Sequence, residues 1–204
     1  MAPTPDTVLA GLPRVVRVAD ESRWRGQAAV ATGLVLGAFW GFTWLLGEPV
    51  EVLRTAVSFG AVLVPTLLGA GLAVGRRMRD NLAHTRRPPA TAVHETAAAS
   101  RDRRMRLATV VLFGLIALLI FDRFTDGGGV MAGLIAGLML GVGVVDWREA
   151  RMWRAAERER DSRLFVLVRP RALMPTIAAS EVFESPNTGS LGPLEMPVDH
   201  LDLG

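Results

Sequence analysis

Four stretches of this chain carry no charged side chain, and three of them have the length of membrane-spanning helices. The four are residues 26–47, 55–75, 107–121 and 127–145. At 1.5 Å per residue, the first two measure about 33 and 32 Å, against roughly 30 Å of bilayer hydrocarbon. The third measures only about 22 Å, but Arg106 and Arg123 flank it and can reach the headgroups with their long side chains. The pattern predicts an all-α integral membrane protein with four transmembrane helices, arranged as two hairpins.

The polar segments around these stretches differ sharply in arginine content. Residues 1–25 hold four arginines, 48–54 one, 76–106 nine, 122–126 one, and 146–171 eight. Cytoplasmic segments of membrane proteins carry an excess of basic residues. The alternation therefore predicts that both termini and the middle loop face the cytoplasm. On this interpretation the chain has a cytoplasmic N-terminal segment, a cytoplasmic Arg-rich loop, and a charged helix that extends the fourth span.

Glycine recurs at every fourth position in two of the predicted spans. The first span contains Gly33, Gly37 and Gly41, and the fourth contains Gly129, Gly133, Gly137 and Gly141. Glycines at this spacing leave one helix face nearly free of side chains and allow another backbone to approach closely. The two faces predict contact between the first and fourth helices, which run antiparallel. Self-association through the same faces is the alternative.

Pro65 lies in the middle of the second span. Proline has no N–H for the carbonyl of Ala61, and its ring crowds the preceding turn, so a kink is predicted here. A bend that serves packing alone is one interpretation. The other is a hinge, or an opened backbone that binds a ligand, because freed carbonyls at membrane depth need protein or water as partners.

Arginines cluster where the predicted spans enter the cytoplasm. Those expected to face lipid headgroups are Arg76, Arg77, Arg79, Arg103, Arg104, Arg106, Arg148, Arg151 and Arg154. They predict contact with the bilayer and with anionic phospholipid headgroups, at about 1 kcal/mol for each arginine near the surface. A solvated helix is the alternative for residues 146–164. No nucleic-acid partner is expected, because the arginines alternate with hydrophobic spans and form no single basic domain.

The end of the chain is acidic and rich in proline, serine and glycine. A β-like run, Leu164 to Val168, precedes it, and residues 172–204 contain five acidic residues and few aromatics. This composition predicts a disordered tail. The alternative is a short docking motif formed by Val198, Leu201 and Leu203.

Motifs with catalytic or ligand-binding chemistry are missing from the sequence. There is no cysteine, and the three histidines, His84, His94 and His200, have no metal-ligand spacing. No phosphate-binding loop or nucleophile elbow occurs, and none of the four charge-free stretches contains the ionisable group that ion-coupled transporters use. The sequence therefore predicts no catalytic residue, no cofactor and no metal.

Composition favours a bacterial membrane protein. Half of the residues are hydrophobic, and all 23 basic residues are arginine, which is typical of a GC-rich bacterial genome. We expect a non-enzymatic, multi-pass protein of the bacterial cytoplasmic (inner) membrane. It would act as a scaffold or accessory subunit and bind a membrane-protein partner or a second copy. The alternative function is a small oligomeric channel or solute facilitator, motivated by Pro65, Thr66 and the glycine-lined faces.

Overall fold

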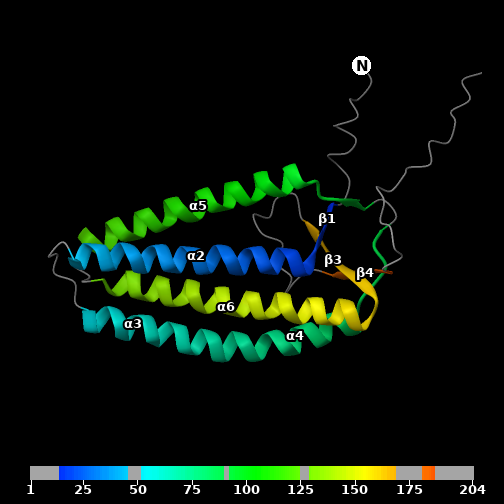
Figure 1. Cartoon of the computed structure of the whole chain (residues 1–204), viewed down its shortest axis with the longest axis horizontal. Helices are drawn as coiled ribbons and strands as arrows, with labels where there is room; N and C mark the ends of the chain where they lie inside the picture. Colours follow the sequence, from blue (N-terminus) through cyan, green and yellow to red (C-terminus); the bar gives the residue numbers. More distant parts are fainter. Residues whose placement is uncertain (1–13, 46–51, 90–91, 125–128, 169–180, 187–204) are drawn as a thin grey trace, which may run out of the picture.

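Long helices lie side by side, and a small β-sheet closes one end of the bundle (Figure 1). The computed structural model describes residues 14–45, 52–89, 92–124, 129–168 and 181–186. The helices are α2 (Val18–Leu45), α3 (Val52–Pro65), the π-helical η1 (Thr66–Ala70), α4 (Gly71–Ala83), α5 (Ala97–Phe124) and α6 (Val130–Glu159). The strands are β1 (Arg14–Arg17), β2 (Val93–His94), β3 (Ser162–Val168) and β4 (Val182–Pro186).

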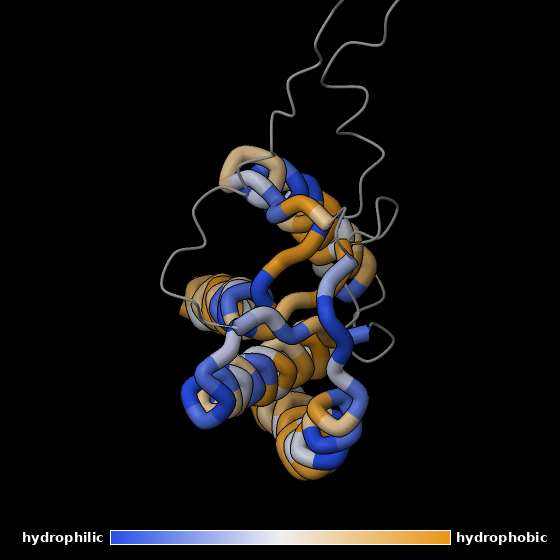
Figure 2. Tube along the Cα trace, turned by 90° about the vertical axis from the view of Figure 1, so that its right-hand side faces the viewer, coloured by the Kyte–Doolittle hydropathy of each residue, from blue (hydrophilic) through white to orange (hydrophobic). Residues whose placement is uncertain are grey.

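Among the described residues, three helices are long and apolar enough to cross a membrane, which makes this a mostly helical, multi-pass membrane protein. They are Val52–Ala83, Ala97–Asp122 and Val130–Glu159, and α2 is not among them. The short third stretch of the sequence, 107–121, is the middle of the 28-residue α5. α6 continues without a break through the predicted boundary at 145. Seen from the sheet end, hydrophilic residues gather at this end of the helices and hydrophobic residues fill the rods behind (Figure 2).

A π-helical segment stands where the sequence predicts a kink. η1 follows Pro65 directly, and α4 continues the same rod. The missing N–H of Pro65 and the bulk of its ring disturb the regular hydrogen-bond ladder, and a wider π turn is one way for a helix to absorb such a disturbance. Thr66, the first residue of this segment, packs on Gly141 of α6.

The glycine ladder of α6 faces α3, which differs from the predicted pairing with α2. A side chain at Gly133 would run into Ser58 and the carbonyl of Thr55, and one at Gly137 into the carbonyl of Phe59. The backbones of α3 and α6 therefore touch along this line. Gly129 is the N-cap of α6, with φ of 92°, a left-handed conformation that favours glycine.

α2 packs against the other side of α6, mostly through residues outside its own ladder. A Cβ at Gly26 would lie 2.9 Å from the carbonyl oxygen of Gly143, and one at Gly33 would lie 2.7 Å from Cγ of Leu140. By contrast, a Cβ at Gly37 or Gly41 would meet no neighbouring atom within 4 Å. The predicted helix pair exists, but its two glycine ladders do not meet, because α3 occupies the ladder of α6.

Strands from four distant parts of the chain form one sheet, in the order β2-β1-β3-β4. β1 is antiparallel to β3 and parallel to β2, while β3 is antiparallel to β4. The sheet therefore joins the segment before α2, the segment between α4 and α5, and the segment after α6. Of these strands, the sequence indicated only the β-like run that lies within β3.

β4 corrects the prediction of a disordered tail from residue 172 onward. Val182 and Phe183 are both buried, and they pack on opposite sides of the sheet, Val182 near Trp153 and Phe183 near Phe165. This five-residue strand is ordered because its apolar side chains complete the sheet on both sides. The remaining parts of the predicted tail, 172–180 and 187–204, lie outside the described residues, as do 1–13 and 169–171.

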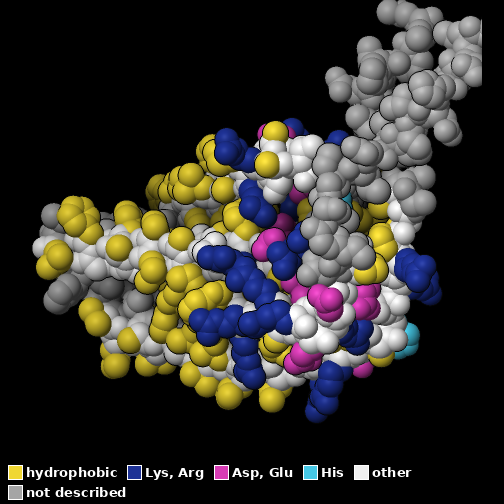
Figure 3. All heavy atoms as spheres, turned by 45° about the vertical axis from the view of Figure 1, so that its right-hand side comes forward, with side chains coloured by type: hydrophobic (Ala, Val, Ile, Leu, Met, Phe, Trp, Pro, Cys, Tyr) yellow, Lys and Arg dark blue, Asp and Glu magenta, His cyan; other side chains and the backbone are white. Residues whose placement is uncertain are grey.

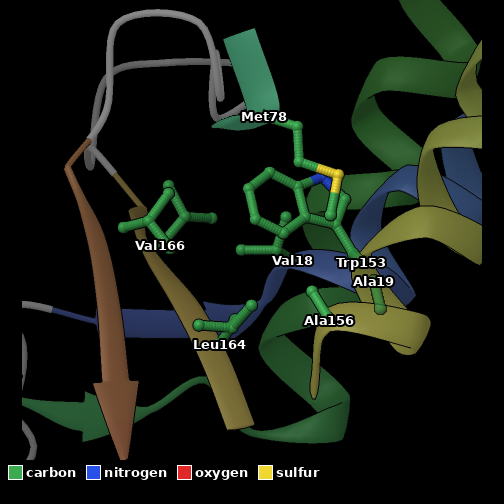
Figure 4. Packing of buried hydrophobic residues seen from close by; sticks show 8 residues of the cluster. Val18, Ala19, Met78, Trp153, Ala156, Leu164 and Val166 are labelled. Atoms are coloured by element: carbon green, nitrogen blue, oxygen red, sulfur yellow. The ribbon is translucent and has the colours of Figure 1, made fainter. Parts of the chain in front are cut away.

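The core lies where the helices meet the sheet. Trp153 of α6 is fully buried, and Figure 4 shows Met78 of α4 and Val18 of α2 beside its ring. Ala150, Trp153 and Ala156 form a buried stripe at helical spacing. The charged end of α6 is therefore not simply a solvated helix, because this face packs against β3.

Candidate functional site

Charged side chains gather inside the protein at the junction of the helices and the sheet. We call these residues the junction network: Arg17, Glu21, Arg25, Glu95, Arg103, Arg104, Asp146, Glu149 and Glu157. The network lies just beyond the charge-free stretches, at their sheet end. Burying a charge costs free energy unless the charge is paired and hydrogen-bonded, so the partners of these side chains are structurally important.

Arg103 forms the centre of the network. Its guanidinium donates to both oxygens of Glu21, at 2.8 and 3.0 Å, and to both oxygens of Glu95, at 3.2 and 3.0 Å. Glu21 is only 1% exposed. Arg104 adds a longer contact of 3.5 Å to Glu21 and lies 5.2 Å from the centre of the Trp24 ring. α5 is thereby fastened to α2 and to the segment that carries β2.

Arg103 also corrects the prediction of a lipid-facing residue. Its side chain is 12% exposed, because Glu21 and Glu95 hold it inside the protein. Arg104 and Arg154 are half-buried, and Arg154 lies 3.6 Å from Asp20. The other predicted basic residues are exposed: Arg76, Arg77, Arg79, Arg106, Arg148 and Arg151.

The pKa of the Glu21 carboxyl group lies below its usual value of 4.5. Burial alone would raise this pKa, but the hydrogen bonds from Arg103 and the charges of Arg103, Arg104 and Arg25 outweigh burial and lower it. A carboxyl whose pKa is lower in the folded state stabilises that state above its unfolded pKa. This stabilisation is lost as the pH falls through the folded pKa.

We therefore expect acid to destabilise the purified protein partly through Glu21. As the pH falls below 4.5, the melting temperature of the wild type should drop. Glu21→Gln should start from a lower melting temperature at pH 7 and fall less over the same acidic range, because it has no proton to take up there. Differential scanning fluorimetry from pH 7 to pH 3 measures both curves. Parallel curves for the two proteins would contradict the role given to Glu21.

A second part of the network surrounds a cavity of about 270 Å³ between α2, α4 and α6. Arg25 approaches Asp146 at 3.8 Å and Glu149 at 3.7 Å, and the indole N–H of Trp153 donates to Glu149 at 3.1 Å. Ala70, the last residue of η1, also lines the cavity. The opposite charges of Arg25 and the two carboxylates hold α2 against α6 at this level.

Arg17 and Glu157 link the helices to the sheet. The Arg17 guanidinium donates to Glu157 at 2.7 and 3.0 Å, and the backbone N–H of Leu164 donates to the same carboxylate at 3.1 Å. The hydrogen bond to Glu157 raises the pKa of Arg17 above its usual value, against the opposing effect of burial. One carboxylate of α6 thus holds both β1 and β3.

In the junction network, arginines and carboxylates neutralise one another's charge. Four carboxylates each accept a hydrogen bond from an arginine, an indole N–H or a backbone N–H, and they belong to Glu21, Glu95, Glu149 and Glu157. Among the described residues no three His, Asp or Glu side chains could hold a metal ion together. His84 contacts the carbonyl of Asp80 and His94 lies against the ring of Phe165. The network can therefore fasten elements together.

Sequence analysis did not single out Glu21, Arg25, Glu95, Asp146 or Glu149. Arg25 and Asp146 stand directly at the ends of charge-free stretches, and this position was the signal available. No such signal marks Glu21 or Glu95, because their partner Arg103 lies 82 and 8 residues away along the chain, respectively.

Comparison with known proteins identifies no relative: no family model, no curated protein and no solved structure matches this chain. The residues and their contacts are therefore the basis on which its function is inferred.

Proposed function

We propose that this chain is a non-enzymatic protein of a bacterial cytoplasmic membrane. It crosses the membrane four times with both termini inside, and it serves as a scaffold or accessory subunit of a larger membrane complex. The observation that carries the proposal is the exposure of α5. Of the side chains described in this helix, only Leu107 and Asp122 are buried.

The sheet supports the four-span topology. β1 pairs with both β2 and β3, so the segments before α2, between α4 and α5, and after α6 belong on the same side of a membrane. If the rod from Val52 to Ala83 crosses the bilayer, the chain must also cross between β1 and Val52, and α2 is the helix in that interval. Exposed apolar side chains on α2 fit this role: Leu34, Val35, Phe39, Phe42 and Leu45.

α5 is fastened at its ends and uncovered between them. Arg103 binds Glu21 and Glu95 at one end, and Asp122 accepts a hydrogen bond from the backbone of Met131 at the other. Its exposed apolar side chains include Val110, Phe113, Ile116 and Ile120. In Figure 1 this helix diverges from the others toward the sheet end. A helix held at fixed points with its apolar surface free is suited to receive the transmembrane helices of a partner.

Site-directed photocrosslinking tests this function, since the chain has no cysteine of its own. A benzophenone-maleimide attached to Phe113→Cys in membranes of the source cells should yield a discrete protein adduct, which mass spectrometry identifies. The matched control is Ala136→Cys, because Ala136 is buried on α6. If Phe113→Cys, Val110→Cys and Ile120→Cys all give no protein adduct, α5 faces only lipid and the accessory role is wrong.

A channel or solute facilitator is the second candidate, and one observation favours it. The π-helical segment η1 ends at the cavity that Arg25, Asp146 and Glu149 line, and π turns often occur at functional sites. Solute flux into liposomes that contain only the purified protein would support this function. Liposomes that remain tight to ions and small solutes would exclude it for the isolated chain.

A further inference from the structure

A basic groove runs along the outside of the junction, separate from the cavity beside η1. Its volume is about 750 Å³. It is lined by Glu157, Asp161 and Ser162 and by five arginines, for which we call it the arginine groove: Arg17, Arg151, Arg154, Arg158 and Arg163. Basic side chains form a conspicuous group between the apolar helices and the sheet end in Figure 3.

Three different elements hold these arginines. Arg151, Arg154 and Arg158 share one side of α6 at helical spacing, while Arg17 belongs to β1 and Arg163 to β3. The bidentate contact with Glu157 holds Arg17 in place, and Arg151 lies 4.1 Å above the Trp147 ring. The groove is therefore built from regular elements whose positions the junction network and the sheet maintain.

The positive charge of the groove is only partly compensated. Glu157 is engaged by Arg17 and by the backbone of Leu164, and Arg154 has only a distant contact of 3.6 Å with the half-exposed Asp20. Asp161 also lines the groove, so two carboxylates, those of Glu157 and Asp161, stand against five guanidinium groups. Guanidinium groups in excess over carboxylates repel one another, so a bound anion would stabilise them. Their planar donors match the oxygens of phosphate in pairs.

The groove also lies at the depth of lipid phosphates if the proposed topology holds. Arg151 follows Val145, the last residue of the charge-free stretch, by six residues, or about 9 Å of helix. Helical side chains point back toward the N-terminus, which for α6 means toward the membrane. Arg158 lies about 20 Å beyond Val145, at the cytoplasmic end of the groove.

We propose that the arginine groove binds a phosphate-bearing anion. The headgroup of an anionic phospholipid and a soluble compound with several phosphates share this chemistry, and the groove is open to either source. The depth argument rests on the proposed topology, whereas the affinity for phosphate rests on the five arginines alone.

Binding measurements on the purified full-length protein test this inference. The groove variant is Arg158→Gln with Arg163→Gln, and the control is Arg87→Gln with Arg101→Gln, which removes the same charge from exposed positions outside the groove and outside the predicted headgroup contacts. One experiment measures retention of phosphatidylglycerol against phosphatidylcholine by native mass spectrometry. The other measures inorganic pyrophosphate binding by isothermal titration calorimetry. Circular dichroism and size exclusion verify that both variants are folded.

The groove variant should bind the phosphate probe at least about tenfold more weakly than the wild type, while the control stays within about twofold. A defect with phosphatidylglycerol alone assigns the groove to a lipid headgroup, and a defect with pyrophosphate alone assigns it to a soluble anion. If the groove variant and the control bind both probes equally well, the inference is wrong. Neither result depends on a protein partner or on membrane orientation, so the proposed function stands or falls separately.

Discussion

Replacing Gly137 with leucine is expected to prevent α3 from packing on α6 and to leave little folded protein. The position of a Cβ at residue 137 is already taken by the carbonyl group of Phe59, which belongs to the backbone of α3 and cannot rotate away. Overpacking of a well-packed contact costs about 1–3 kcal/mol, and a whole leucine against a rigid backbone belongs at or above the upper end. Detergent-solubilised Gly137→Leu should therefore elute as aggregate in fluorescence-detected size exclusion.

Gly37→Leu is the matched control, because Gly37 has the same spacing in its own ladder but open space around it. This variant should elute like the wild type and melt within about 2 °C of it, as surface substitutions change stability by at most about 0.5 kcal/mol. If Gly37→Leu were as damaging as Gly137→Leu, the ladder of α2 would be a contact surface, and self-association through it would have to be reconsidered. Normal elution of Gly137→Leu would contradict the α3–α6 contact.

Replacing Arg103 with methionine is expected to have the second-largest effect. The substitution keeps the length of the side chain but leaves Glu21 and Glu95 buried without the cation between them. Removal of one partner from a buried ion pair costs about 3–5 kcal/mol, since the remaining charge is uncompensated. The melting temperature of Arg103→Met should fall by roughly 6–20 °C, at about 2–4 °C per kcal/mol for a chain of this size.

Arg106→Met provides the comparison, because Arg106 is exposed and pairs with the equally exposed Asp102 one helical turn away. Exposed pairs of this kind contribute about 0.3–0.5 kcal/mol, so this variant should be nearly as stable as the wild type. The double variant Glu21→Gln with Arg103→Met should be less destabilised than the sum of the two single changes. Strict additivity would show that Glu21 and Arg103 do not interact directly.

Much of the helical framework was predictable because it depends on patterns that are local in sequence. Charge-free stretches of about 20 residues identify helices that can cross a membrane, and three of the four predicted spans lie in helices that meet this criterion in the structure. The continuation of α6 beyond residue 145 follows from a run of helix-forming residues without a break. The mostly helical, multi-pass character of the protein is therefore confirmed.

The sheet was not predictable, because its strands are short and lie far apart in the chain. β1 has four residues and β2 two, and neither shows enough alternation to be recognised as a strand. Val182 and Phe183 gain their order from contacts with β3 and the core, not from a local pattern. Only β3, with consecutive apolar residues near Val166, gave a local signal.

Which helices pack against each other also cannot be predicted from a single sequence. The glycine ladders of α2 and α6 are alike in spacing, and nothing in either indicates which neighbour covers it. In the structure α3 covers Gly133 and Gly137 and η1 covers Gly141, while Gly37 and Gly41 stay open. The lipid-facing role predicted for Arg103 failed for a related reason: position near a membrane boundary does not show that a carboxylate such as Glu21 lies opposite.

The central claim is that the chain crosses the membrane four times, with the sheet in the cytoplasm. Cysteine accessibility tests it most directly, with single substitutions at Glu48 between α2 and α3, Arg87 between α4 and α5, and Asp126 between α5 and α6. In intact spheroplasts, a membrane-impermeant maleimide should label Glu48→Cys and Asp126→Cys and leave Arg87→Cys unlabelled until the membrane is opened. Labelling of Arg87→Cys in intact spheroplasts, or protection of Glu48→Cys there, would contradict the claim.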